Sequence, residues 1–195
     1  MIKYYENILK TIYDSLESIN EDEFNDLMNE CYTTIKNGGK LIFSGLGKNV
    51  PICEKIVGTF NSLGIPASFM HTNSAMHGDL GMIKKEDLVF VLSKSGNTAE
   101  SILLANYLIY RGVNSYTITF NKDCKLSNIL NKSLTLKLAN EGDNWNIIPN
   151  NSTSIYLILL QGIALQLADK LGVTLSDFKI NHPGGAIGEE LKNVK

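Results

Sequence analysis

The sequence predicts an α/β fold, with one doubly wound, mostly parallel sheet flanked by helices. Short apolar runs that fit buried strands alternate along the chain with segments of helical periodicity. The clearest run is Leu88 to Leu92, which breaks into a turn of small residues before an amphipathic helix begins. The chain has 195 residues, the size of one α/β domain, and a hydrophobic fraction of 44% is enough for a substantial core. We therefore expect a single domain over residues 1–195.

Two helices are predicted ahead of the first strand, within residues 1–38. Apolar side chains recur at helical spacing between residues 3 and 20. Asn20 is suited to cap a second helix, which Gly38 and Gly39 end. We expect these helices to flank the sheet or to form a contact between subunits, and the α/β core to occupy residues 40–192.

Strands and helices then alternate through the core. The predicted strands cover residues 40–44, 67–70, 88–92, 113–120 and 134–138. The predicted helices cover residues 50–63, a short piece within 71–82, the stretch from the turn after residue 92 to residue 111, and residues 125–130 and 152–171. The last of these is apolar around much of its circumference, so we expect it in the core or in a dimer contact. A long loop over residues 140–151 and a short helix ending near residue 192 complete the chain.

Composition excludes several classes of partner. The net charge is -2 and the pI about 5.9, so we expect no surface for nucleic acid or for an anionic membrane. The N-terminus lacks the apolar segment of a secretory signal, and no apolar run reaches the length of a membrane span. Cys31, Cys53 and Cys124 lack metal spacing, which is typical of reduced thiols in a cytoplasmic protein. Charged residues make up only 19% of the chain, which favours a homo-oligomer.

A phosphate-binding loop is predicted at residues 93–98, between a strand and a helix. Backbone N–H groups at the start of a helix lack partners within it, and the helix dipole favours negative charge there. Ser93, Ser95 and Thr98 add hydroxyl donors, and Gly96 allows a ligand to approach the backbone closely. A tight turn without a ligand uses the same small residues, so that alternative stays open.

A second small-residue loop follows the first strand, from Ser44 to Asn49. Its Gly45-Leu46-Gly47 would suit a dinucleotide, but Val50 occupies the third glycine position and the Walker A pattern is absent. Because ligands of such sheets bind beyond the carboxyl ends of the strands, the two loops together favour a small phosphorylated metabolite. Lys48 is placed to neutralise phosphate or a developing oxyanion, unless it is simply solvated.

Histidines and two glutamates supply the remaining candidates for chemistry. His71, His77 and His182 all lie in polar, glycine-containing loops, where functional residues are common. His71 and His77 can ligate a metal, although their spacing is not diagnostic of a metal site. Glu100 begins a helix, where a carboxylate also stabilises the helix dipole, and Glu141 lies in the long loop, where solvent would also accommodate it. Either carboxylate is a candidate general base.

Four motifs carry a resemblance to a known family, in the order SGLGKN, HGDLGM, SKSGNTAE and NHPGG. They resemble the sugar isomerase (SIS) domain, and more closely its arabinose-5-phosphate isomerase branch, over residues 40–192. The resemblance implies the SIS fold and an aldose–ketose isomerase that interconverts D-arabinose 5-phosphate and D-ribulose 5-phosphate. It implies no redox cofactor, and a product used for Kdo in lipopolysaccharide or capsule. The family usually carries CBS domains after this module, so this sequence resembles a short, single-domain form.

The resemblance also implies roles for single residues. The expected catalytic residues are Lys48, His77, Glu100, Glu141 and His182. The phosphate is expected on Ser44, Ser93, Ser95 and Thr98, and the rest of the substrate near Gly47, Asn49, His71 and His77. His71 is also the candidate ligand for an inhibitory or structural zinc ion. Catalytic groups in this family come from more than one subunit, which implies an obligate homo-oligomer, expected to be a tetramer.

The implied chemistry moves a proton between C1 and C2 of an opened sugar through an enediol. His77 or His182 is suited to open the ring, and a carboxylate or His182 is suited to take the C2 proton. The chain departs from the family at Asn150 and Asn151, which interrupt a late serine/threonine run. Two alternatives remain. The NHPGG segment argues against another phosphosugar isomerase, such as one for a hexulose phosphate, and the retained Lys48, glutamates and histidines argue against a phosphosugar-binding sensor without turnover.

Overall fold

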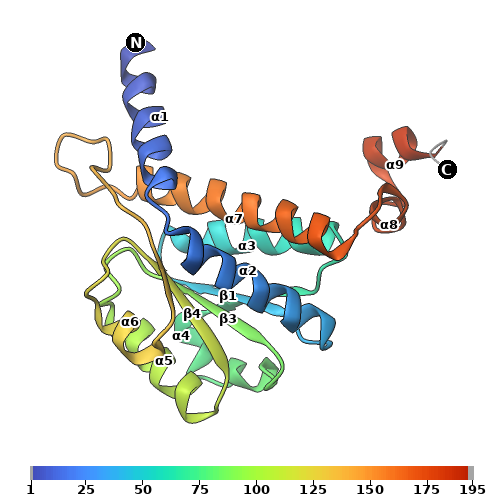
Figure 1. Ribbon diagram of the computed structural model, residues 1–195, viewed down its shortest axis with the longest axis horizontal. Helices are drawn as coiled ribbons and strands as arrows, with labels where there is room; N and C mark the ends of the chain where they lie inside the picture. Colours follow the sequence, from blue (N-terminus) through green and yellow to red (C-terminus); the bar gives the residue numbers. More distant parts are fainter. Residues whose placement is uncertain (1, 193–195) are drawn as a thin grey trace.

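The computed structural model describes residues 2–192 and contains a five-stranded parallel sheet (Figure 1). The strand order is β2-β1-β3-β4-β5, and every neighbouring pair is parallel. The strands are β1 (Leu41–Gly45), β2 (Ala67–His71), β3 (Leu88–Leu92), β4 (Asn114–Thr119) and β5 (Ser133–Thr135). The chain moves outward from β1 to β2 and then crosses back to β3, so the order reverses between β1 and β3. Such a switch point opens a crevice at the carboxyl ends of the strands.

Helices cover both faces of the sheet, as the alternation of side chains along the strands requires. On one face, Phe43 and Phe90 stack with ring centroids 5.0 Å apart in a core shared with α2 (Glu21–Lys36), α3 (Asn49–Ser62) and α7 (Asn151–Leu171). On the other face, Val89 and Val91 share a core with α4 (Thr72–Ala75), α5 (Ala99–Tyr110) and α6 (Lys125–Leu130). The remaining helices are α1 (Ile2–Glu17), η1 (Asp79–Met82), α8 (Leu175–Ile180) and α9 (Gly185–Leu191).

The predicted doubly wound α/β fold is confirmed, and most predicted elements begin and end close to the observed ones. The side chain of Asn20 accepts a hydrogen bond from the backbone N–H of Glu23 at 3.0 Å, as expected of a helix cap. The last strand is shorter than predicted, because only Ser133–Thr135 pairs with β4 at the edge of the sheet. The periodicity does not predict α8, which is six residues long and is held by a capping box between Thr174 and Asp177.

α7 is the central helix of its layer. It has 21 residues and is long and apolar enough to cross a membrane by length and composition, which the prediction from apolar runs missed. In the fold it packs against α1, α2 and α3, and Ile155, Tyr156 and Leu160 are completely buried. Its apolar surface is therefore used to join the helices to the sheet, as expected of a core helix.

Candidate active site

The carboxyl ends of β1, β2 and β3 bring the predicted loops together at the switch point. Gly45 at the end of β1 lies opposite His71 on β2 and opposite Leu92 on β3. The side-chain amide of Asn49 donates to the backbone carbonyl of Leu92 at 3.2 Å, which ties the loop after β1 to the end of β3. The loop containing Gly47 and Lys48 therefore begins beside the strand that leads into residues 93–98.

Residues Ser93–Thr98 form a compact turn, which we call the anion loop. The backbone N–H of Gly96 donates to Ser93 Oγ at 3.2 Å, and Ser93 Oγ lies 3.3 Å from Thr98 Oγ1. Ser95 is exposed, and its hydroxyl accepts from the N–H of Asn97 at 3.2 Å. Within residues 2–192, the backbone N–H groups of Thr98, Ala99 and Glu100 have no acceptor, as is usual where a helix begins. These donors can receive an anion.

Gly96 is required by the packing beneath the anion loop. Its φ is +63°, and a Cβ at this position would lie 2.1 Å from the Sγ atom of Cys124. Cys124 is completely buried and caps α6 by accepting from the N–H of Ser127. The anion loop thus rests directly on the start of α6, and the backbone at Gly96 has no room for a side chain.

Lys48 and Ser44 differ in their access to the crevice. Lys48 is exposed at the start of α3, where Gly47, with φ +55°, turns the chain into the helix. Ser44 is completely buried, and its hydroxyl lies 2.9 Å from that of Thr72. Ser44 therefore joins β1 to the start of α4 in this structure, whereas Lys48 can contact a ligand. Thr72 was missed by sequence reasoning, because only the pairing of β1 with β2 brings it beside Ser44.

His71 and His77 flank α4 at the same edge of the sheet. His71 Nδ1 accepts from the N–H of Asn73 at 3.2 Å and caps α4. His77 is exposed between α4 and η1. Among residues 2–192, no three His, Cys, Asp or Glu side chains gather as a metal site. A zinc ion at His71 would therefore need ligands from solvent or from another molecule.

The two candidate carboxylates lie in opposite environments. Glu100 is exposed in the first turn of α5, directly after the anion loop. Glu141 is completely buried, and its Oε1 lies 2.7 Å from both Lys94 Nζ and Ser152 Oγ. Its Oε2 accepts from the N–H groups of Asn150 at 3.1 Å and Ser152 at 2.9 Å. Burial alone would raise the pKa of Glu141, but these hydrogen bonds outweigh it and hold the pKa below its ordinary value.

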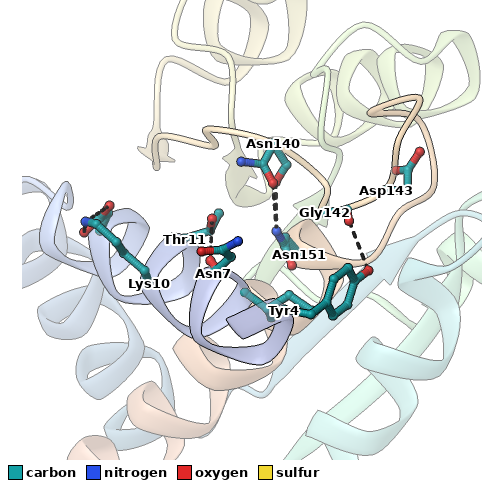
Figure 2. Close-up of a pocket in the computed structure, with 10 residues that line it drawn as sticks. Tyr4, Asn7, Lys10, Thr11, Asn140, Gly142, Asp143 and Asn151 are labelled. Atoms are coloured by element: carbon teal, nitrogen blue, oxygen red, sulfur yellow. Dashed lines mark hydrogen bonds and ion pairs between the residues drawn. The ribbon is translucent and has the colours of Figure 1, made fainter. Parts of the chain in front are cut away.

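A cavity of about 330 Å³ lies beside the loop that carries Glu141, on the side of α1 (Figure 2). The hydroxyl of Tyr4 donates to the carbonyl of Gly142 at 3.0 Å, and the amide of Asn151 donates to the carbonyl of Asn140 at 3.0 Å. These bonds anchor the chain on both sides of Glu141, one to α1 and one to the start of α7. The residues of the anion loop are not among those that line this cavity.

His182 lies far from the other predicted site residues. Its Nε2 is 2.7 Å from Ser62 Oγ, its Nδ1 is 2.7 Å from the carbonyl oxygen of Phe178, and its ring stacks on that of Phe178. Ser62 is the last residue of the 14-residue helix α3, and Lys48 immediately precedes the first. At a rise of about 1.5 Å per residue, the length of α3 places Lys48 about 20 Å from Ser62, and hence from His182, which contacts Ser62. Figure 1 shows α8 and α9 at the end of the molecule away from α6 and the long loop.

The fold and this edge of the sheet define a class of protein: an α/β domain that can hold a small anion at helix N-termini beyond the carboxyl ends of parallel strands. A model of the SIS domain matches residues 34–168. The chain therefore belongs to the SIS domain family, as the four motifs predict.

Named relatives share much of the chain. An arabinose 5-phosphate isomerase of Pseudomonas aeruginosa is 33% identical over 178 residues, which are 91% of this chain and 55% of that protein. The protein of the same name from Escherichia coli K12 is 35% identical over 153 residues, 78% of this chain and 47% of that protein. The chain thus spans about half the length of these relatives. A structure from Escherichia coli CFT073 in complex with arabinose 5-phosphate matches with a TM-score of 0.86 and 32% identity, over 92% of this chain and 94% of that chain.

Proposed function

We propose that the protein is an isomerase that interconverts D-arabinose 5-phosphate and D-ribulose 5-phosphate through an enediol. The observation that carries the proposal is the meeting of the anion loop and Lys48 at one switch point, beside exposed His77 and Glu100. An enediol reaction needs an anchor for phosphate, a cation for the developing oxyanion, and exposed groups that exchange protons. The relatives named arabinose 5-phosphate isomerase and the related structure that holds arabinose 5-phosphate support this substrate.

Roles follow from exposure and position. The anion loop holds the phosphate, so that binding energy remote from the reacting carbons contributes to catalysis. Lys48 stabilises the oxyanion at C1 or C2. His77 or His182 opens the ring. Glu100 is the better placed carboxylate for the C2 proton, because both oxygens of Glu141 already accept two hydrogen bonds each. His182 remains the other candidate for this step.

The proposed enzyme is a homo-oligomer, a tetramer, whose sites are shared between subunits. Lys48 and His182 of one chain lie at opposite ends of α3, so His182 serves the site of another copy. α1 projects from the body of the molecule (Figure 1). Ile2, Tyr5, Leu9 and Tyr13 recur along one face of α1 and are 73%, 59%, 64% and 62% exposed. Exposed apolar side chains gathered in this way are typical of a surface that another subunit covers.

Sharing of the site can be tested by mixing two inactive variants. Lys48→Ala and His182→Asn subunits are co-expressed with different tags, and the mixed oligomer is isolated. If His182 acts across subunits, the mixed oligomer contains sites with both groups intact and regains turnover. A mixed oligomer as inactive as its parents would contradict a shared site.

The activity itself is tested with D-arabinose 5-phosphate as substrate and ketose as the measured product. We expect turnover without added cofactor, because C1 and C2 exchange oxidation states within one molecule. Lys48→Ala, Glu100→Gln and His182→Asn should each reduce turnover by orders of magnitude while the fold is retained. Binding of the sugar phosphate without ketose would favour the sensor, and turnover of a hexulose phosphate alone would favour the other isomerase.

The proposed function extends to the use of the product, the cellular compartment and inhibition by zinc. We propose that the product supplies Kdo for lipopolysaccharide or capsule and that the enzyme works in the cytoplasm. A zinc ion bound at His71 would cover the crevice beside Gly45 and inhibit turnover. Titration with zinc should then inhibit the wild type more strongly than a His71→Ala variant, and equal inhibition of both would exclude His71 as the ligand.

A further inference from the structure

Lys94 is the one charged residue inside the anion loop, and its side chain reaches away from the loop to a distant segment. Its Nζ lies 2.7 Å from Oε1 of Glu141, which follows it by 47 residues in the sequence. The Lys94 side chain is 41% exposed, whereas that of Glu141 is completely buried. The ion pair therefore joins a surface loop to a buried anion.

The backbone of Lys94 is fastened as well. Its carbonyl oxygen accepts from the N–H of Phe120 at 3.1 Å and from Thr119 Oγ1 at 3.2 Å, both at the end of β4. The main chain of Lys94 thus fixes the anion loop to the sheet, and the side chain fixes it to Glu141. The side chain of Lys94 therefore gives Glu141 a direct contact with the loop.

Glu141 is in turn hydrogen-bonded to the start of α7. Three of the four hydrogen bonds that its carboxylate accepts come from Asn150 and Ser152, at the point where the helix begins. Among residues 2–192, Lys94 is the one cation paired with this carboxylate. A buried carboxylate that loses its only cation is strongly disfavoured, so each member of the pair constrains the other.

We propose that Lys94 is a positioning residue of the candidate site, which acts through Glu141 to hold the anion loop against the amino-terminal end of α7. This inference rests on the proposed function, because that function makes the anion loop the phosphate site. It assigns Glu141 a supporting role under the loop and leaves proton transfer to Glu100, His77 and His182.

The opposite alternative is that Lys94 attracts the anion directly, as a nearby positive charge. The two alternatives predict opposite signs for one variant. Glu141→Gln removes a negative charge close to the anion loop, so simple Coulomb attraction would make an anion bind more tightly. If Glu141 instead positions the loop through Lys94, the same substitution weakens binding, because the loop loses its anchor.

The experiment measures sulfate binding to the full chain by calorimetry, because sulfate mimics phosphate and keeps its charge across the neutral range. We expect Lys94→Met and Glu141→Gln each to weaken binding by about tenfold, the size typical of directly coupled residues. The double variant should bind no more weakly than the weaker single variant. Lys94→Arg, which can still reach a carboxylate, should restore most of the affinity. Lys122→Met is the matched control, since Lys122 is an exposed lysine of a neighbouring loop with the same charge.

A pH series separates positioning by Glu141 from a Coulomb effect of its charge. In Lys94→Met the buried Glu141 lacks its cation, so its pKa rises and it takes up a proton as the pH falls. Because Glu141 no longer reaches the loop in this variant, its protonation should leave sulfate affinity following pH no more steeply than in the wild type, whereas a Coulomb effect of its charge would tighten binding as the pH falls. This measurement also serves if Glu141→Gln does not fold.

Three outcomes would overturn the proposal. They are tighter sulfate binding by Glu141→Gln or by Lys94→Met at falling pH, additive effects in the double variant, or a Lys94→Met variant that matches Lys122→Met in affinity. Failure of the proposed function is a separate result. Wild-type protein that binds sulfate but produces no ketose would refute the isomerase, while the sulfate series would still decide the role of Lys94.

Discussion

Replacing Gly96 by alanine tests whether the anion loop is built on Cys124. The new Cβ would lie 2.1 Å from Cys124 Sγ and 2.6 Å from Cys124 Cβ, so the loop or the start of α6 must move. The φ of +63° adds a cost of about 1–2 kcal/mol for a residue with a Cβ. Overpacking of this kind adds about 1–3 kcal/mol. We expect the free energy of unfolding to fall by about 2–5 kcal/mol and sulfate binding to be lost.

Urea unfolding followed by far-ultraviolet circular dichroism measures the change in stability. Gly58→Ala is the matched control: Gly58 lies inside α3, where a Cβ would meet nothing within 4 Å. This control should gain about 0.5–1 kcal/mol, because alanine favours a helix interior over glycine. A Gly96→Ala variant that stays within about 0.5 kcal/mol of the wild type and still binds sulfate would refute the reasoning.

Three further predictions concern acid stability, assembly and the long loop. Burial raises the pKa of Asp87, but hydrogen bonds from Lys40 and Lys84 outweigh it and hold the pKa below its ordinary 3.8. The unfolded chain therefore binds more protons, and the stability that Asp87 contributes above pH 3.8 is lost as the pH falls below that value. Asp87→Asn should have a lower free energy of unfolding at neutral pH, and this free energy should fall less steeply as the pH drops below 3.8. An unchanged dependence of stability on acid pH would contradict this. Leu9→Glu should lower the mass measured by light scattering, whereas a mass equal to the wild type would exclude α1 from the interface. Asp143→Ala removes an acceptor for the N–H groups of Trp145, Ile147 and Ile148, so we expect faster proteolysis of this loop with little change in global stability.

Local patterns predict the fold well because they act within a few residues. The cap at Asn20, Pro51 in the first turn of α3 and the apolar run Leu88–Leu92 each act over a single turn or strand. Periodicity does not predict α8, because this helix has only six residues and no buried apolar face. A capping box stabilises it instead. The length of β5 depends on its partner strand, and periodicity along one segment carries no information about pairing.

The candidate site is predicted only where its residues share a loop or an edge of the sheet. Ser93, Thr98 and Lys48 lie where the rule for carboxyl ends of parallel strands expects them. The contacts of Glu141 with Lys94 and of Ser44 with Thr72 join segments far apart in the sequence. Such contacts depend on how layers pack, so a single sequence gives no sign that Glu141 is buried and fully hydrogen-bonded.

The exposure of the candidate catalytic side chains links catalysis to assembly. Lys48, His77 and Glu100 are all exposed in the single chain, at an edge where water has free access. An enediolate in contact with bulk water loses the benefit of fixed dipoles and is open to side reactions, so an isomerase needs this edge covered. His182 lies about 20 Å from Lys48 along α3, in the short segment between α8 and α9. A second copy that brings α8 and α9 over this edge would supply both the missing histidine and the cover. Variants that break assembly should therefore abolish turnover even when each chain keeps its fold.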